Sequence, residues 1–199
     1  MTIRFLWQLF IGMVILFLAS PVVKTFYFNS GLRWQYIFLF AFLTAYFATP
    51  LCRILALRYH ILDRPDWRKI HDVPTPLLGG LAVYIAFSFS ILLNGIFLPG
   101  MNVLLLGATL ILFMGIVDDA YPLPALLKFI LQMAIALIVI LLGKIQLTFF
   151  YNASWAPIIN IPLTLLWIVG LTNAMNFFDG IDGLAASLSI TSAFFLGII

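Results

Sequence analysis

The chain has 199 residues, of which 64% are hydrophobic and only 9% are charged. This composition excludes an ordinary water-soluble globular domain, in which apolar and polar residues are closer to balance. The net charge of +3 would suit a nucleic-acid partner in a soluble protein, but here the basic residues flank apolar stretches. Membrane topology explains them better, and we expect no nucleic-acid partner. The single Cys52 excludes an internal disulfide and a thiolate metal site.

The first apolar stretch starts close to the N-terminus and covers Phe5–Val23. As a helix it is long enough to cross a bilayer. A cleaved signal peptide is the alternative, but the stretch lacks a small-residue cleavage site and runs into Pro21 and Lys24. We therefore expect a retained signal anchor, and we treat residues 1–33 as an additional N-terminal span with an exterior loop.

Six further apolar stretches of similar length follow along the chain: Trp34–Cys52, Leu77–Leu98, Met101–Val117, Leu123–Leu142, Trp155–Leu171 and Gly183–Ile199. Backbone surrounded by lipid must form its hydrogen bonds within the segment, so each stretch is predicted to be a helix. Short loops between the stretches leave no room for a separate soluble domain. The sequence therefore predicts an all-α, polytopic transmembrane bundle of about seven spans, with residues 34–199 as the main membrane domain.

The charged residues predict which loops are cytoplasmic. With alternating spans, seven of the ten Lys and Arg residues fall on the side of the N-terminus, as the positive-inside rule requires. The seven acidic residues are all Asp and fall on that same side: Asp63, Asp66, Asp72, Asp118, Asp119, Asp179 and Asp182. The last four stand at the ends of otherwise uncharged spans, where ionisable side chains are costly and usually face a polar cavity. The cytoplasmic face is therefore the predicted place of the chemistry.

The first acid-containing loop, residues 63–80, reads DRPDWRKIHDVPTPLLGG. Its Arg and Lys side chains could clamp phosphate groups, and the helix that follows could add backbone N–H groups. The alternative is a basic collar that sets the orientation of the protein and touches anionic lipid headgroups. For this loop taken alone, the collar is the favoured interpretation.

Two adjacent carboxylates, Asp118 and Asp119, end the fourth stretch. Neighbouring side chains on a helix diverge by about 100°, so one is expected to point into the bundle and the other to its rim. Such carboxylates suit Mg²⁺, which commonly binds through one or two of them together with substrate phosphates. An ordinary helix end is an equal alternative for the pair alone. Lys128, with Gln132 one turn further on, either reaches the headgroups or returns to the same polar site.

Four polar residues recur at steps of three at the end of the sixth stretch: Asn173, Asn176, Asp179 and Asp182. This spacing predicts one slowly drifting helical stripe, and Gly180 and Gly183 permit a bend and a close backbone approach. An amide network between packed membrane helices would explain the two Asn residues. It leaves two carboxylates without a nearby basic residue in the sequence, so a polar binding site is favoured.

Taken together, in this order and spacing, these motifs resemble those of the polyprenyl-phosphate N-acetylhexosamine-1-phosphate transferase family. This family includes the bacterial membrane enzymes that start lipid-linked glycan and peptidoglycan synthesis. The similarity runs from about Tyr36 to the end of the chain. It implies transfer of a sugar phosphate from a UDP-N-acetylhexosamine to a polyprenyl (undecaprenyl) phosphate, with release of UMP and with Mg²⁺ as cofactor, Mn²⁺ being the alternative metal. The loop of residues 63–80 looks more like the branch that uses UDP-N-acetylglucosamine than the muramoyl-pentapeptide branch.

The resemblance also implies roles for individual residues. Asp118 would orient or deprotonate the attacking lipid phosphate, and Asp119 and Lys128 would order the metal and the phosphates. The expected metal ligands are Asp119 and Asp179. The expected contacts of the nucleotide sugar are Asn173, Asn176, Asp179, Gly180, Asp182, Lys69 and His71. Members of the family are longer and carry a later metal-binding Asp, so the chain is expected to be an N-terminal part of the fold that is inactive by itself.

The location implied by the resemblance is a bacterial inner membrane, with the active site at the cytoplasmic face, in contact with membrane lipid. The implied processes are cell-wall, lipopolysaccharide or teichoic acid synthesis, and a homodimer stays open. A proton- or cation-coupled transporter is the alternative from another class, because intramembrane acids are common in such proteins. A transporter needs acids near the middle of the bilayer, whereas these stand at span ends. A noncatalytic remnant is the third alternative.

Overall fold

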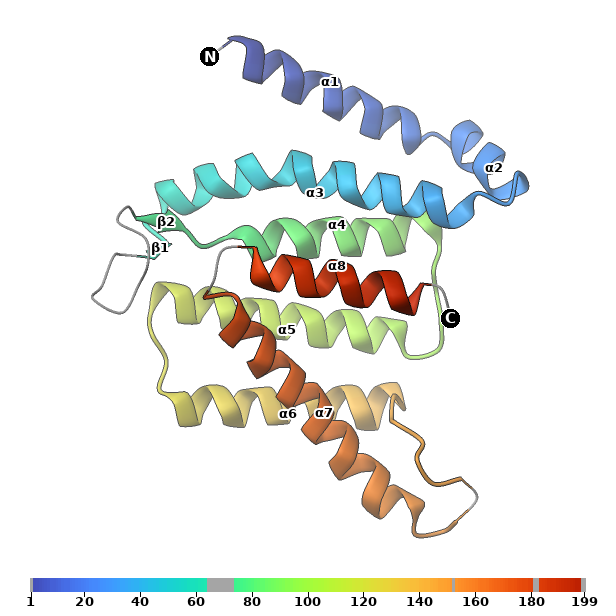
Figure 1. The fold of residues 1–199 in the computed structure, drawn as a ribbon, viewed down its shortest axis with the longest axis vertical. Helices are drawn as coiled ribbons and strands as arrows, with labels where there is room; N and C mark the ends of the chain where they lie inside the picture. The colour runs from blue at the N-terminus through green and yellow to red at the C-terminus, as the bar shows by residue number, and fades with distance from the viewer. Residues whose placement is uncertain (1, 64–73, 152, 181–182, 198–199) are drawn as a thin grey trace. The chain divides into compact units, whose positions relative to one another are not determined.

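The computed structural model describes residues 2–63, 74–151, 153–180 and 183–197 (Figure 1). Within these residues the regular structure consists of eight α-helices and one very short β-ribbon. The chain divides into two compact units, Met1–Pro124 and Ala125–Ile199, and each is described by itself. The prediction of an all-α membrane fold is confirmed.

The first unit contains five helices and the β-ribbon: α1 Thr2–Leu18, α2 Pro21–Asn29, α3 Arg33–Arg58, β1 Leu62–Asp63, β2 Thr75–Pro76, α4 Gly79–Asn94 and α5 Met101–Ala120. The second unit contains the remaining helices: α6 Ala125–Gly143, α7 Ala156–Phe178 and α8 Leu184–Leu196. Each apolar stretch of the sequence is helical over most of its length in the described residues. The connections α1–α2, α2–α3 and α5–α6 are short, as expected from the sequence, whereas longer segments join α3 to α4 and α6 to α7.

The count of about seven spans is not confirmed. Among the described residues, four helices are long and apolar enough to cross a membrane, namely α3, α5, α6 and α7, and α1 with α2 makes a fifth if the bent pair is one span. The apolar helices α4 and α8 are shorter. The predicted first span, Phe5–Val23, is not a straight helix, because α1 and α2 meet at 63°.

The bend between α1 and α2 has a local cause and a tertiary partner. Pro21 opens α2 and has no backbone N–H group with which to continue α1. The buried hydroxyl of Tyr36 in α3 donates a hydrogen bond to the carbonyl of Leu18 at 2.8 Å. Leu18, Tyr36 and Phe40 form a buried cluster around this contact. Contacts with α3 therefore stabilise the bend between α1 and α2.

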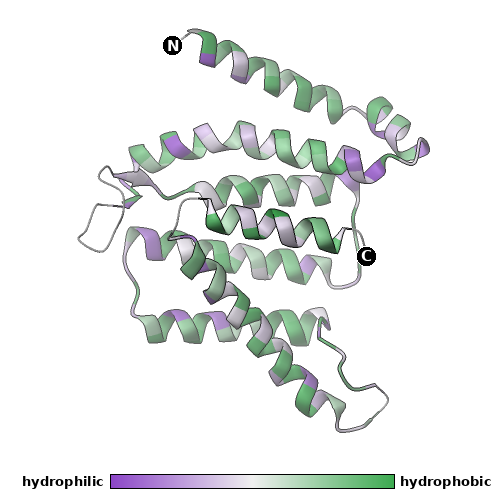
Figure 2. Cartoon of the chain, in the orientation of Figure 1, coloured by the Kyte–Doolittle hydropathy of each residue, from purple (hydrophilic) through white to green (hydrophobic). Residues whose placement is uncertain are grey.

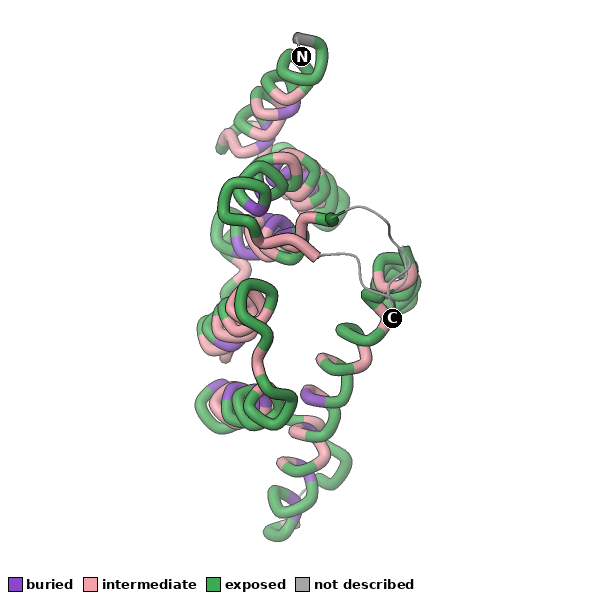
Figure 3. Tube along the Cα trace, turned by 90° about the vertical axis from the view of Figure 1, so that its left-hand side faces the viewer, coloured by how far each residue is buried: buried purple, intermediate pink, exposed green. Residues whose placement is uncertain are grey.

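The main core of the first unit lies between α3 and α4. Buried residues follow each helix at steps of four: Tyr36, Phe40, Thr44, Ala48, Cys52 and Ala56 on α3, and Ala82, Ala86, Ser90 and Asn94 on α4. A step of four keeps residues on one face of a helix, and small side chains let two helix backbones approach closely. Figure 3 shows such buried positions between surfaces that are mostly exposed.

The outer surfaces of the helices are apolar. Large side chains such as Phe38, Phe113, Leu142 and Leu166 are exposed. Figure 2 shows that hydrophobic positions predominate along the helices. In water such a surface would be an aggregation hazard, but in a bilayer it faces lipid of matching polarity. The fold is that of an integral membrane protein.

Candidate functional site

The Asp118–Asp119 pair ends α5, as the sequence predicts. The helix stops at Ala120, and the extended residue Tyr121 follows it. The carboxylate of Asp118 accepts a hydrogen bond from the backbone N–H of Leu123, with 2.9 Å between Oδ1 and N. Asp118 thus holds the short turn that leads out of α5, and its side chain stays at this end of the helix.

The two carboxylates lie in different environments. Asp118 is partly buried, whereas Asp119 is exposed. This difference agrees with the expected divergence of neighbouring side chains on a helix. The structure therefore offers one carboxylate that is tied to the backbone and partly buried, and a second one that is exposed.

The β-ribbon brings the ends of the basic loop to the same end of the first unit. Asp63 of β1 pairs with Thr75 of β2 in an antiparallel register. β1 contacts α5 and β2 contacts α3. Ile116, just before the Asp pair, packs with Ile61 against a core cluster that includes Ala56 and Leu78. The loop that starts after Asp63 therefore leaves and returns beside the carboxyl-terminal end of α5.

Two predicted contacts of the nucleotide sugar, Lys69 and His71, lie in residues 64–73, outside the described residues. Asp182 likewise lies outside them. On either side of these loop residues, Asp63 and Thr75 pair with each other in the β-ribbon.

In the second unit, a side-chain hydrogen bond joins α6 to α7. Nδ2 of Asn173 donates to Oε1 of Gln132 at 2.6 Å and also to the carbonyl of Val169 at 2.8 Å. The Gln132 side chain is buried, with 6% of it exposed. The sequence pattern places Gln132 one turn after Lys128 but does not predict its partner. The signal that could have identified it is a lone amide inside an apolar span, which needs a polar partner.

Polar residues lie on either side of this bond along the chain. α7 crosses α6 obliquely (Figure 1). Lys128 precedes Gln132 by about one turn and lies in the first turn of α6. Asn176 follows Asn173 by about one turn, and Asp179 caps the same end of α7.

The predicted helical stripe is shorter than its spacing suggested. α7 ends at Phe178, and Asp179 is its C-cap residue, with its N–H donating to the carbonyl of Met175 at 3.1 Å. A turn includes Gly180, and Gly183 opens α8 with a φ of 77°. This left-handed conformation suits glycine and interrupts a helix. The stripe of Asn173, Asn176 and Asp179 is confirmed as helical only up to this cap.

The described residues contain no group of three or more His, Cys, Asp or Glu side chains that could hold a metal ion. This does not argue against Mg²⁺, since that ion commonly uses one or two protein carboxylates and takes its remaining ligands from phosphates and water. The donor chemistry of Asp118 and Asp119 fits a hard cation of this kind.

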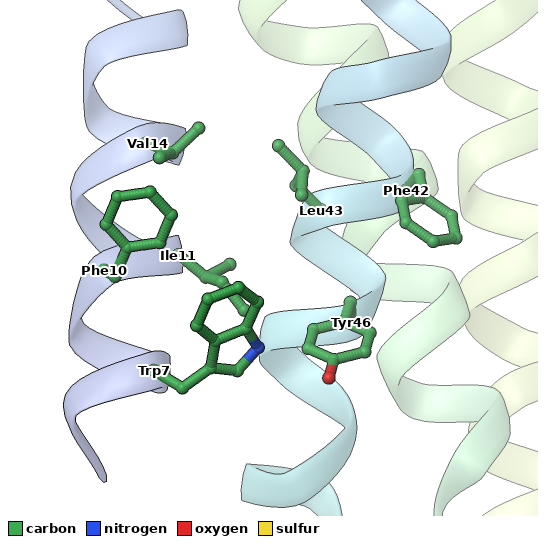
Figure 4. A pocket seen from close by; sticks show the side chains of 7 residues that line it. All are labelled: Trp7, Phe10, Ile11, Val14, Phe42, Leu43 and Tyr46. Atoms are coloured by element: carbon green, nitrogen blue, oxygen red, sulfur yellow. The ribbon is translucent and has the colours of Figure 1, made fainter. Parts of the chain in front are cut away.

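A pocket of about 370 Å³ lies between α1 and α3 (Figure 4), and none of the predicted site residues lines it. It is lined by Trp7, Phe10, Ile11, Val14, Phe42, Leu43 and Tyr46. Its lining is apolar apart from the indole N–H and the phenol hydroxyl. It therefore lacks the charged groups that phosphate chemistry needs, and we do not assign the reaction to it.

Comparison with known families and proteins agrees with the family resemblance. The family described as glycosyl transferase family 4 matches residues 101–199, which contain the Asp pair, Lys128 and the Asn173–Asp179 stripe. No solved structure matches the chain.

Three curated relatives illustrate the similarity. The Bacillus subtilis protein named "probable undecaprenyl-phosphate N-acetylglucosaminyl 1-phosphate transferase" is 38% identical over 162 residues, which are 77% of this chain and 44% of the relative. The decaprenyl-phosphate N-acetylglucosaminephosphotransferase of Mycolicibacterium smegmatis is 35% identical over 77% of this chain and 41% of its own. The undecaprenyl-phosphate alpha-N-acetylglucosaminyl 1-phosphate transferase of Escherichia coli K12 is 31% identical, over 82% of this chain and 45% of the relative.

The chain spans less than half the length of these relatives. The residues matched by the family include most of the predicted site. The chain belongs to the polyprenyl-phosphate N-acetylhexosamine-1-phosphate transferases of glycosyl transferase family 4.

Proposed function

We propose that the whole protein transfers N-acetylglucosamine-1-phosphate from UDP-N-acetylglucosamine to a polyprenyl phosphate and releases UMP. The observation that carries this proposal is the position of Asp118 and Asp119 at the end of α5, beside the ribbon that flanks the basic loop. Carboxylates and basic groups at one membrane boundary suit a reaction between a lipid phosphate and a water-soluble nucleotide sugar. The names of the relatives support the choice of sugar and lipid.

In the proposed reaction, an oxygen of the lipid phosphate attacks the phosphorus that carries the sugar. A new P–O bond forms to this phosphorus, its P–O bond to the bridging oxygen of the donor breaks, and UMP leaves with that oxygen and the electron pair. Any proton on the attacking phosphate passes to Asp118, which is also the residue fastened to the Leu123 N–H. Because most of the catalysis in such transfers lies in positioning and charge neutralisation, a fastened carboxylate suits the role.

The proposed metal is Mg²⁺, which would neutralise charge on the donor phosphates. Asp119 is the proposed ligand in the first unit, since it is the more exposed member of the pair. Asp179, the C-cap residue of α7, is the proposed ligand in the second unit. Carboxylate oxygens are the ligands that this ion prefers.

The remaining polar residues are proposed to hold the donor. Lys128 would contribute a positive charge to the phosphates. Asn173 and Asn176, with the backbone at Gly180, would contact the nucleotide, together with Asp182. Lys69 and His71 are proposed to contact the donor from the basic loop.

A cation-coupled transporter is less well supported. In the described residues each acidic side chain stands at the end of a regular element: Asp63 in β1, Asp118 and Asp119 in the last turn of α5, and Asp179 at the cap of α7. A transporter needs ionisable groups near the middle of the bilayer, with access from both sides. The family match also favours the transferase.

The decisive experiment uses the purified full-length protein. UMP release from UDP-N-acetylglucosamine should require both polyprenyl phosphate and Mg²⁺, and Asp118→Asn should abolish it. The amide oxygen of Asn can still accept the Leu123 N–H, so this variant removes the charge while it keeps the turn. Absence of lipid-linked sugar with every UDP-N-acetylhexosamine would refute the proposal.

The proposal also includes a location: the protein lies in a bacterial inner membrane, and its active site is on the cytoplasmic side. Single cysteines introduced at Pro74 and Ser154, both exposed in the structure, report on the two faces. Labelling from outside intact cells with a membrane-impermeant maleimide should modify only the cysteine at position 154. Modification at position 74 alone would contradict the proposed orientation.

A further inference from the structure

Two cations flank one aromatic ring where α2 meets α3. The Lys24 ammonium lies 5.5 Å from the centre of the Phe28 ring, and the Arg33 guanidinium lies 4.8 Å from the same ring. Arg33 also lies 5.9 Å from the ring of Trp34. Cation–π contacts of this kind fix the positions of both charges. The junction between α2 and α3 is among the hydrophilic positions of this unit (Figure 2).

The two cations are already positioned by the fold. Lys24 Nζ donates to the carbonyl of Leu93 in the last turn of α4, at 2.6 Å. The C-terminal end of a helix carries partial negative charge, which helps to hold an ammonium there. Lys24 and Arg33 both lie against the ring of Phe28, so the two side chains share one place at the junction of three helices.

In the described residues of the first unit, the carboxylates stand in β1 and in the last turn of α5 rather than at this junction. The first 62 residues contain neither Asp nor Glu. The first acid, Asp63, follows the opposite end of α3, a helix of 26 residues that spans about 39 Å at 1.5 Å per residue. Within the described residues, Nε of Arg33 is buried without a hydrogen-bond partner. A guanidinium that is partly removed from water without an anion is costly, so an external anion would stabilise it.

The surroundings of the pair indicate where that anion comes from. Exposed aromatic side chains, among them Phe26 and Trp34, surround the junction. Aromatic residues of this kind gather at the boundary between membrane and water, at the level of the lipid headgroups. The anion present at this level in every bilayer is phosphate, and Arg and Lys bind phosphate through charge-assisted hydrogen bonds. Anionic lipids add a net attraction for clustered basic residues.

We propose that Lys24 and Arg33 bind the headgroup phosphate of an anionic phospholipid at the junction of α2, α3 and the end of α4. This site lies at the end of the first unit opposite to the Asp118–Asp119 pair, and it does not depend on the proposed transferase reaction. The single negative charge of the lipid phosphodiester offsets part of the charge of the two cations, and the bound lipid ties the bent α1–α2 segment to the α3–α4 core.

The test uses the full chain in nanodiscs of phosphatidylcholine, alone or mixed in equal parts with phosphatidylglycerol. Lipids that stay bound after gentle extraction are identified by native mass spectrometry. The unmodified protein should retain phosphatidylglycerol in preference to phosphatidylcholine. The double variant Lys24→Gln/Arg33→Gln should lose this preference, while Arg33→Lys, which keeps the charge, should lose less of it than Arg33→Gln.

Lys144→Gln is the matched control, because Lys144 is a lone exposed cation in the second unit. It should leave the preference unchanged. Circular dichroism verifies that each variant keeps its helix content, and the single variant Lys24→Gln serves if the double variant does not fold. An unchanged preference in the folded variants, or an equal loss in Lys144→Gln, would overturn the proposal. Displacement of the bound lipid by inorganic phosphate would assign the site to a free anion instead.

Discussion

Asn173 of α7 and Gln132 of α6 form a hydrogen bond of 2.6 Å. Both helices are long and apolar enough to cross a membrane. The bond fixes the register of the polar end of α7 against α6. The buried Gln132, which lies outside the proposed reaction centre, thereby holds Asn173, three residues before Asn176.

We expect Gln132→Leu to destabilise the second unit by about 0.5–2 kcal/mol, the range measured for side-chain hydrogen bonds between membrane helices. The variant removes the acceptor of Asn173, although the helix propensity of Leu is as good as that of Gln. Reversible unfolding in mixed micelles measures the change. Gln35→Leu is the control, because Gln35 is exposed in the first turn of α3. An equal effect of both variants would mean that the bond contributes no stability of its own.

Tyr36→Phe should destabilise the bend between α1 and α2. The variant removes the hydroxyl that donates to the Leu18 carbonyl and leaves a buried acceptor unsatisfied, at a cost of about 1–3 kcal/mol. Hydrogen–deuterium exchange of residues 18–24 should become faster. Tyr46→Phe is the matched control, because Tyr46 is exposed on the same helix and should leave the exchange unchanged.

Asp118 is expected to have two separable roles. Asp118→Ala should speed amide exchange at Leu123, because the N–H loses its acceptor, and it should also abolish the proposed activity. Asp118→Asn should abolish the activity and leave the exchange near that of the unmodified protein. If Asp118→Asn also speeds exchange at Leu123 as much as Asp118→Ala does, the turn depends on the charge rather than on an acceptor.

The segment between α6 and α7 should depend on Asn160. Its amide accepts from the Phe150 N–H at 3.4 Å and donates to the Phe150 carbonyl at 3.2 Å, and the side chain is 2% exposed. Asn160→Ala leaves both backbone groups without these partners, so we expect a loss of about 1–3 kcal/mol and faster exchange at residues 145–151. Asn102→Ala, at an exposed position in the first turn of α5, should change neither quantity.

Part of the site was predictable because its residues are unusual for their setting. Asp118 and Asp119 stand out as charges at the end of an uncharged span, and α5 ends where that pattern indicated. The stripe that starts at Asn173 is also helical, but only to Phe178, because spacing alone cannot tell whether Gly180 and Gly183 continue a helix or break it. Gly183 adopts a left-handed conformation and ends the periodicity.

The count of spans was less predictable for a similar reason. Apolar stretches such as Phe5–Val23 and Leu77–Leu98 are long enough in sequence, yet the first is divided by the bend at Pro21 and the second yields the short helix α4. Hydropathy measures the transfer of side chains into lipid and does not report the bend or the length of the resulting helix.

The sequence by itself determined the chemical character of this protein: an apolar chain needs internal backbone hydrogen bonds in lipid, and its costly charges stand at helix ends. It also carried the motifs of the family. Only the tertiary structure decided which groups are partners, such as Tyr36 with Leu18, Asp118 with Leu123, and Gln132 with Asn173. These contacts depend on the geometry of turns and on the packing of helices, which periodicity and composition do not specify.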